Sequence, residues 1–151
     1  MDENQAKARK ALRRLCLFQI AAEHAYRRLL RCSLSQDLKE KVRDFAREEE
    51  EQLAQLADWH MKFSTSPPGN SAARKFFGWA YSTTLALLGE RAVIKGLSML
   101  EDYGLGVFKQ QQMRLLDLGY SEISTALQPL LKIQKSHAQF FANELRRRKN
   151  T

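Results

Sequence analysis

Six polar side chains with metal-binding or hydrogen-bonding chemistry interrupt the apolar stripes of this sequence. They are Glu23, Glu49, Gln52, Glu101, Gln134 and His137. An ionised carboxylate in a helical core is costly unless a cation or a hydrogen-bond donor compensates its charge. Carboxylate and imidazole also bind iron together, because carboxylates can bridge cations while neutralising them. The set predicts either a metal centre or a layer of mutually hydrogen-bonded side chains inside a helical bundle.

Apolar spacing places the first three of these residues on helix faces turned toward a core. One stripe steps by four and three through Leu12, Cys16, Gln19, Glu23, Tyr26 and Leu30. A second has the clearest periodicity of the chain and contains Leu38, Val42, Phe45, Glu49, Gln52, Leu56, Trp59 and Phe63. Such steps put all members of a stripe on one helical face. Of the four adjacent glutamates only Glu49 lies on this face, so we expect Glu48, Glu50 and Glu51 to be solvated.

The other three residues lie on two further stripes. Glu101 is the carboxylate within a stripe that contains Ile94, Leu97, Leu105, Phe108 and Leu115. The last stripe contains Ile123, Leu127, Leu130, Gln134, His137 and Phe141. The pairs Glu49–Gln52 and Gln134–His137 have i, i+3 spacing, which directs both members of a pair to one side of the helix. Four helices that each carry polar residues inward are typical of carboxylate-bridged di-metal bundles.

Breaker residues between the stripes predict an all-α chain without strands. We expect four helices, whose approximate ranges are residues 4–31, 36–63, 72–118 and 122–148. The run Ser64–Asn70 should carry a crossover, over residues 64–72, between two antiparallel helix pairs. Pro129 either kinks the last helix or moves its start later. The four glycines of the third helix, at 89, 96, 104 and 106, either weaken it or allow a close approach or a kink. The chain is therefore predicted to be a single domain, residues 1–151, folded as an up-down-down-up bundle.

Charge and hydropathy narrow the classes of partner. The 151 residues carry a formal net charge of +8, with basic clusters at residues 7–14, 27–31 and 146–149. Such clusters attract phosphate, but no nucleic-acid-binding motif or aromatic stacking platform accompanies them, which argues against nucleic acid. Anionic lipid is the other candidate. The apolar segment Phe76–Leu88 is too short to span a bilayer and is either a buried helix start or an interfacial segment.

The sequence favours a cytoplasmic location, with a peripheral membrane contact as an alternative. The chain begins with charged residues and shows no secretory signal. Cys16 and Cys32 fall in one predicted helix, about 24 Å apart at 1.5 Å per residue, so they cannot bridge each other. Unpaired thiols fit a reducing compartment, and Cys16 is expected to be an inert core thiol.

Two segments resemble the demethoxyubiquinone hydroxylases, which are ferritin-like di-iron enzymes of ubiquinone biosynthesis. GWAYSTTLALLGERAVIKGLSMLED, residues 78–102, resembles the segment that leads into the glutamate of their third helix. EEEEQL, residues 48–53, resembles their Glu-x-x-His-Leu element. The similarity extends over about residues 12–145. It implies a ferritin-like antiparallel four-helix bundle with one crossover connection, and iron as the cofactor.

The resemblance carries over an incomplete ligand set. The positions that match the family's metal ligands are Glu23, Glu49, Glu101 and His137. The family pattern would place histidine at Gln52 and glutamate at Gln134, and a His-Tyr pair where this chain has Val107-Phe108. Gln111 matches a glutamine of the family. Glutamine is a neutral, poor ligand for iron, so we expect a degenerate site that holds at most one metal ion. His24 or His60 could replace a lost ligand; the alternative for both is a surface position.

Two classes of function fit these features. The first is an iron-dependent oxidoreductase of the monooxygenase type, acting on a quinone or another apolar substrate near a membrane. The second is a catalytically inactive relative, a helical bundle that binds a lipid, a quinone or a partner protein, with a homodimer as one form. The metal content of the purified protein separates the two classes.

Overall fold

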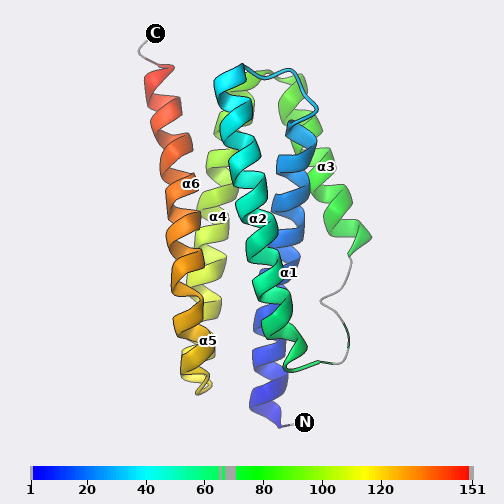
Figure 1. Ribbon diagram of the computed structural model, residues 1–151, viewed down its shortest axis with the longest axis vertical. Helices are drawn as coiled ribbons and strands as arrows, with labels where there is room; N and C mark the ends of the chain where they lie inside the picture. Colours follow the sequence, from blue (N-terminus) through cyan, green and yellow to red (C-terminus); the bar gives the residue numbers. More distant parts are fainter. Residues whose placement is uncertain (1, 65, 67–70, 150–151) are drawn as a thin grey trace.

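The computed structural model describes residues 2–64, 66 and 71–149, and these residues form helices and connecting turns with no strand. The helices are α1 (Glu3–Leu29), α2 (Gln36–Met61), α3 (Ala72–Leu87), α4 (Glu90–Asp117), α5 (Ser121–Ala126) and α6 (Gln128–Arg147) (Figure 1). The prediction of an all-α chain is confirmed. No helix of the described residues is long and apolar enough to cross a membrane.

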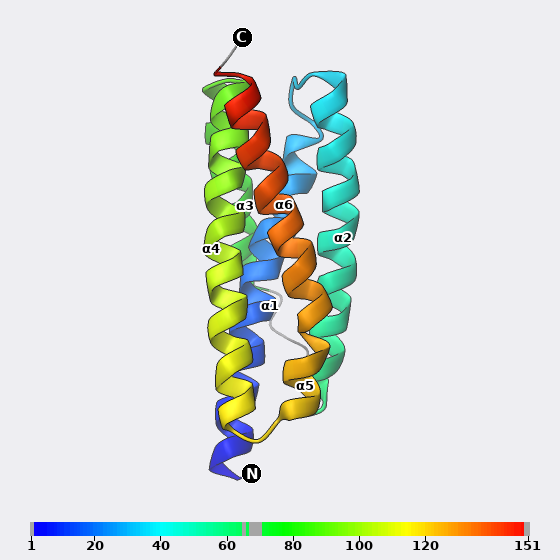
Figure 2. The same cartoon turned by 90° about the vertical axis from the view of Figure 1, so that its left-hand side faces the viewer.

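Four of the helices form the bundle. In Figures 1 and 2, α1 and α6 run upward whereas α2 and α4 run downward, which is the predicted up-down-down-up order. The largest contacts within the bundle are those of α1 with α2 and of α4 with α6. The connection from α2 to α4 spans the length of the bundle and contains α3, which packs alongside α1 and runs parallel to it (Figure 1). This connection is the crossover, and a helix occupies most of it.

The predicted single helix over residues 72–118 is wrong, because the chain reverses direction at Gly89. Gly89 has φ 95°, a left-handed conformation that only glycine adopts readily, and it is the N-cap residue of α4. The crossover therefore extends well beyond the predicted 64–72, and residues 65 and 67–70 of that range lie outside the described residues. Among the four glycines, Gly89 is the one at which the helix ends.

The outer bounds of the other helices differ less from the prediction. α1 ends at Leu29, so Cys32 lies beyond it and the two cysteines do not share a helix, contrary to prediction. Cys16 is buried in the core, and burial raises the pKa of its thiol to about 12, as expected for an inert thiol. Pro129 lies in the first turn of α6, after the short α5, which agrees with the later-start alternative.

Two apolar clusters enclose the middle of the bundle. One cluster contains Leu12, Leu15, Phe18, Leu56, Phe108 and Leu115 among its buried members. The other contains Tyr26, Leu29, Val42, Ile94, Leu97 and Phe141. Five buried polar side chains fall, along their helices, between residues of the two clusters: Glu49, Gln52, Glu101, Gln134 and His137.

The contact between α1 and α3 depends on Gly78. A Cβ atom at this position would collide with the backbone carbonyl of Ala21, which no side-chain rotation could relieve. Gly106 of α4 is also helical, but a Cβ atom there would meet nothing within 4 Å. The two glycines therefore form a matched pair for testing the packing of the crossover helix.

We expect Gly78→Ala to lower the free energy of unfolding by about 1–3 kcal/mol, because the added methyl forces α3 away from α1. Gly106→Ala should raise it by about 0.5–1 kcal/mol, since alanine loses less backbone entropy in a helix. Urea unfolding followed by circular dichroism measures both. Equal effects of the two substitutions would contradict the close approach of α3 to α1.

Candidate metal centre

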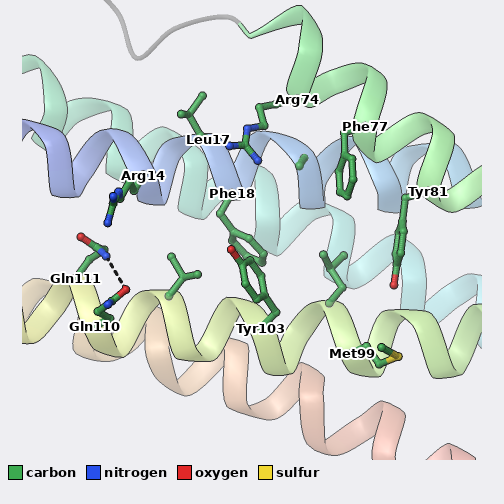
Figure 3. Close-up of a pocket in the computed structure, with 13 residues that line it drawn as sticks. Arg14, Leu17, Phe18, Arg74, Phe77, Tyr81, Met99, Tyr103, Gln110 and Gln111 are labelled. Atoms are coloured by element: carbon green, nitrogen blue, oxygen red, sulfur yellow. Dashed lines mark hydrogen bonds between the residues drawn. The ribbon is translucent and has the colours of Figure 1, made fainter.

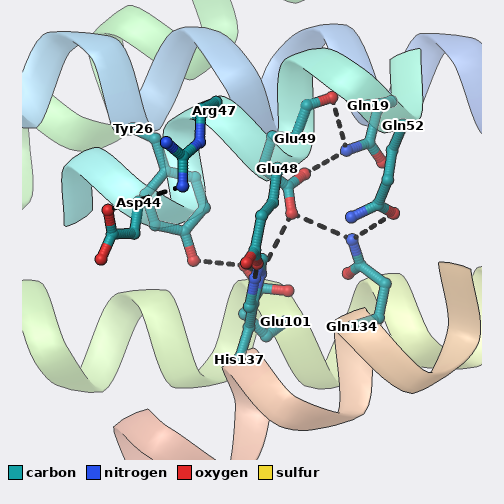
Figure 4. Close-up of polar contacts among 10 residues, drawn as sticks. All are labelled: Gln19, Tyr26, Asp44, Arg47, Glu48, Glu49, Gln52, Glu101, Gln134 and His137. Carbon is teal, nitrogen blue, oxygen red and sulfur yellow. Dashed lines mark hydrogen bonds and ion pairs between the residues drawn. The ribbon is translucent and has the colours of Figure 1, made fainter. Parts of the chain in front are cut away.

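Three of the predicted ligands come together in the middle of the bundle. Glu49 of α2, Glu101 of α4 and His137 of α6 each offer one ligand atom, and these atoms lie within 4.8 Å of one another. The His137 Nδ1 atom is 3.2 Å from Glu49 Oε1 and 3.6 Å from Glu101 Oε1. At most 1% of each of the three residues is exposed. The cluster is thus a buried meeting point of three helices (Figure 4).

Neighbouring side chains hold the imidazole of His137 in place. Its Nε2 atom lies 2.5 Å from Glu48 Oε2, so a hydrogen on Nε2 is donated to that carboxylate. The ring of Phe45 stacks on the imidazole with 3.9 Å between ring centroids. Because Nε2 is engaged by Glu48, Nδ1 is the nitrogen that faces Glu49 and Glu101. A carboxylate on the far nitrogen orients a metal-binding histidine and raises its basicity.

The carboxylates are held in turn by neutral donors. The Tyr26 hydroxyl donates to Glu101 Oε1. Gln19 Nε2 donates to Glu49 Oε2 and, at 3.2 Å, to the Glu49 backbone oxygen. Gln134 Nε2 donates to Glu49 Oε1 at 3.1 Å. Each buried carboxylate is therefore oriented by at least one hydrogen bond from a neighbouring helix (Figure 4).

The two glutamines at altered ligand positions belong to the same layer. Gln134 Nε2 lies 3.3 Å from Gln52 Oε1, and both residues are buried. They occupy the side of Glu49 that is turned away from His137 in Figure 4. On this side of the layer, amide hydrogen bonds take the place that two charged ligands would have in the family pattern.

Burial and mutual contact shift the pKa values of the cluster. Burial, together with the charge of Glu101, raises the pKa of Glu49 to about 7. Burial alone would lower the pKa of His137, but its contacts with Glu101 and Glu49 raise it to about 10. Burial and the neighbouring glutamates raise the pKa of Tyr26, so its hydroxyl stays a neutral donor. Without a metal ion, a protonated His137 is the cation that compensates the carboxylates.

The cluster fits a single divalent cation. Two of its buried atoms, Glu101 Oε2 and His137 Nδ1, have no well-directed hydrogen-bond partner, although buried polar atoms usually have one. Two carboxylates and one imidazole are a donor set that iron and other first-row metals accept. Glu49, Glu101 and His137 would be the ligands of such an ion.

Glu23, the fourth predicted ligand, lies outside this cluster. Its carboxylate is buried, but it pairs with the guanidinium of Arg27 and lies 2.6 Å from His24 Nδ1. Arg27 also reaches Glu50 at 3.0 Å. An ion pair thus compensates Glu23 where the prediction expected a metal ion.

Neither of the two further histidines joins the cluster within the described residues. His24 is half-buried and occupied by Glu23. His60 is buried, and its pKa is lowered by burial and by the charges of Arg9 and Arg13. The surface position considered for His60 is therefore wrong.

Sequence periodicity missed the contribution of Glu48. It was expected to be solvated like Glu50 and Glu51, which are exposed, yet its side chain is 37% exposed and its carboxylate reaches His137. The spacing of apolar residues locates a Cα atom on the helix surface but does not report how far a long side chain reaches around it. Gln19 and Tyr26 lie on the predicted α1 stripe, but nothing in the sequence assigned them to the carboxylates.

The fold is that of a solved ferritin-like protein. The chain matches the crystal structure of a ferritin-like, diiron-carboxylate protein from Bacillus anthracis str. Ames with a TM-score of 0.77 and 13% sequence identity, over 96% of this chain and 99% of the other. No protein-family model and no curated protein matches the sequence. The predicted ferritin-like bundle is thereby confirmed, and at this identity the likeness concerns the fold.

Substitution of Glu49 tests the compensation of charge in the layer. In metal-free protein, Glu49→Ala should lower the free energy of unfolding by about 3 kcal/mol or more, because His137, Gln19 and Gln134 lose their common acceptor. Glu51→Ala removes an exposed carboxylate two positions along the same helix and should change it by less than about 0.5 kcal/mol. Denaturant unfolding in the presence of a chelator gives both values. Similar losses in the two variants would place Glu49 outside the layer.

Proposed function

We propose that this protein is a ferritin-like metal-binding protein that holds one metal ion per chain, in the first instance iron, at Glu49, Glu101 and His137. The observation that supports this most directly is the convergence of three buried ligand atoms from three helices within 4.8 Å. The Glu101 Oε2 atom, which has no hydrogen-bond partner, and the His137 Nδ1 atom, which has ion-pair contacts but no well-directed hydrogen bond, add to it, because a cation would bind both. Glu48 and Tyr26 act as positioning residues for His137 and Glu101.

The neutral amides support one metal ion rather than two. A second ion would need further charged ligands on the side of Glu49 where Gln52 and Gln134 lie. These glutamines hydrogen-bond to each other and to Glu49, so the layer is already satisfied there. Glutamine also lacks the negative charge that would offset a second dication.

The metal stoichiometry tests this proposal. We expect protein from iron-replete cells to carry at most one iron per chain, by elemental analysis, without the absorption of an oxygen-bridged di-iron centre. The double variant Gln52→His with Gln134→Glu should bind two, because both side chains point to the same layer as Glu49 (Figure 4). Replacing the exposed pair Glu51→His and Gln139→Glu should leave the stoichiometry at one. Two irons in the unmodified protein would contradict the degenerate site.

An oxidoreductase that acts on a quinone or another apolar substrate is the favoured activity for such a site. Iron bound there would supply one-electron and dioxygen chemistry. The supporting feature is an apolar groove on the far side of Phe18 from the polar layer: Phe18 and Leu100 line the groove, and the Phe18 ring and the Gln134 amide both lie beside Gly104. Dioxygen uptake by reduced, iron-loaded protein that requires an apolar substrate supports the enzyme, and the absence of such uptake supports the non-catalytic alternative.

The outer face of α3 suggests a peripheral membrane contact. Large apolar side chains on α3 are exposed to solvent: Phe76 by 65%, Trp79 by 47% and Leu87 by 83%. Leu88, directly after the helix, is 71% exposed. Exposed apolar side chains of this size mark interaction surfaces when they lie together. A net charge of +8 would add attraction to an anionic bilayer. A second copy of the chain is the other partner that this face could accept.

We expect binding to anionic vesicles to weaken when Leu87→Ser and Leu88→Ser are combined. The control is Met113→Ser, which removes a large apolar side chain that is 65% exposed from α4. Sedimentation with vesicles at low and high salt measures the effect, and binding should fall as salt screens the basic surface. Unchanged binding in the double variant, or a concentration-dependent dimer that the variant abolishes, would favour the second copy over the membrane.

A further inference from the structure

A groove of about 530 Å³ lies between α1, α3 and α4. Its volume is within the range of about 300–1,000 Å³ that is typical of small-molecule sites. Most of its wall is apolar or aromatic, and includes Leu17, Phe18, Phe77, Met99, Tyr103 and Val107. Figure 3 shows that the groove is elongated along α4, with Met99 and Tyr81 at one end and Gln110 and Gln111 at the other.

The groove leaves large apolar side chains open to solvent. The exposed fractions are 54% for Phe77, 61% for Met99 and 67% for Tyr103. The floor beneath them is Phe18, whose ring lies 5.9 Å from that of Tyr103 and edge-on to that of Phe108. An apolar ligand in the groove would cover these three side chains, and burial of apolar area is the main source of binding energy for such a ligand.

Two arginines bring positive charge to the groove: Figure 3 shows Arg14 at the end where Gln110 and Gln111 lie, and Arg74 nearer the middle, close to Phe18. Arg14 of α1 and Arg74 of α3 both line it, and neither guanidinium makes an ion pair or a hydrogen bond with the described residues. No carboxylate is among the lining residues. Beyond Arg14 the groove adjoins a shallow recess on α1 that is lined by Arg9, Lys10 and Arg13. The Arg14 end of the groove, with Arg74 next along it, therefore offers uncompensated positive charge to a ligand.

Gln111 provides a second polar feature at the same end. The residue is 1% exposed and its Oε1 atom has no hydrogen-bond partner, while its Nε2 atom donates to Gln110 at 3.2 Å. Figure 3 shows the Gln111 amide facing Arg14 across the groove. A buried amide oxygen without a partner is rare in native proteins, and a bound polar group would satisfy it.

We propose that this groove binds a single-chain amphiphile with a carboxylate head, that is, a fatty acid. The alkyl chain lies along the apolar wall between Leu17 and Met99, and the carboxylate lies at Arg14 and Arg74. Guanidinium groups bind carboxylates through paired, charge-assisted hydrogen bonds, which a neutral quinone ring cannot provide. The protonated form of the acid could also donate to Gln111 Oε1. This assignment does not depend on the metal site.

The experiment is a calorimetric titration of the full chain with monomeric laurate and, separately, with dodecanol. Replacing both arginines, Arg14→Gln with Arg74→Gln, should weaken laurate binding at least tenfold and leave dodecanol binding unchanged. The control is Arg91→Gln, which removes the charge of an exposed arginine of α4 that does not line the groove. Val107→Phe, which narrows the half-buried wall, should weaken both ligands.

Three results would overturn the proposal. One is that Arg91→Gln weakens laurate binding as much as the double arginine variant does, because the effect would then come from the net charge of the protein and not from the groove. Another is loss of dodecanol binding together with laurate binding in the arginine variant. The third is binding to anionic vesicles without binding to monomeric laurate, which would assign the arginines to a membrane surface. The iron content of the same samples tests the metal proposal independently, because the arginine variant should bind as much iron as the unmodified protein.

Discussion

The bundle depends on the compensation of buried negative charge in its central layer. Glu49 and Glu101 are withdrawn from water by two apolar clusters, and the free energy of such a withdrawal is prohibitive unless positive charge or donors accompany it. The chain provides an imidazole from the opposite helix pair and amide or hydroxyl donors from α1 and α6. Every helix of the bundle thus contributes a side chain to the compensation of this buried charge. The contacts of the layer also link the α1–α2 pair to the α4–α6 pair and fix how the two pairs are aligned along the bundle.

The buried carboxylates are compensated differently on the two sides of the layer. On the His137 side, charge is compensated by a group that a metal ion could replace, and two polar atoms lack a well-directed hydrogen bond. On the Gln52 side, amides satisfy one another and Glu49, and a metal ion would have to displace hydrogen bonds without gaining charged ligands. The amides of Gln52 and Gln134 leave a polar layer whose three potential metal ligands, Glu49, Glu101 and His137, lie on one side of it.

Periodicity predicted the parts of this structure that depend on which face of a helix a residue occupies. It placed Glu49, Glu101 and His137 inward, and it separated Glu49 from Glu50 and Glu51. It could not place Glu23 with Arg27, because an ion pair one turn along the same helix competes with the core for a carboxylate and leaves no trace in the apolar pattern. It could not identify Gly89 as the end of a helix, since the other glycines of the same stretch stay within α4.

The crossover helix has a consequence for the dynamics of the molecule. Only Gly78 and Ser82 of α3 are buried, whereas each bundle helix buries a full stripe. Little apolar area is exposed when α3 separates from α1, so its opening costs less free energy than global unfolding. Amide hydrogens of α3 should then exchange with solvent through a local opening that leaves α1 and α4 protected. The groove between these helices would be widened by the same motion, which couples access to its interior to the local stability of α3.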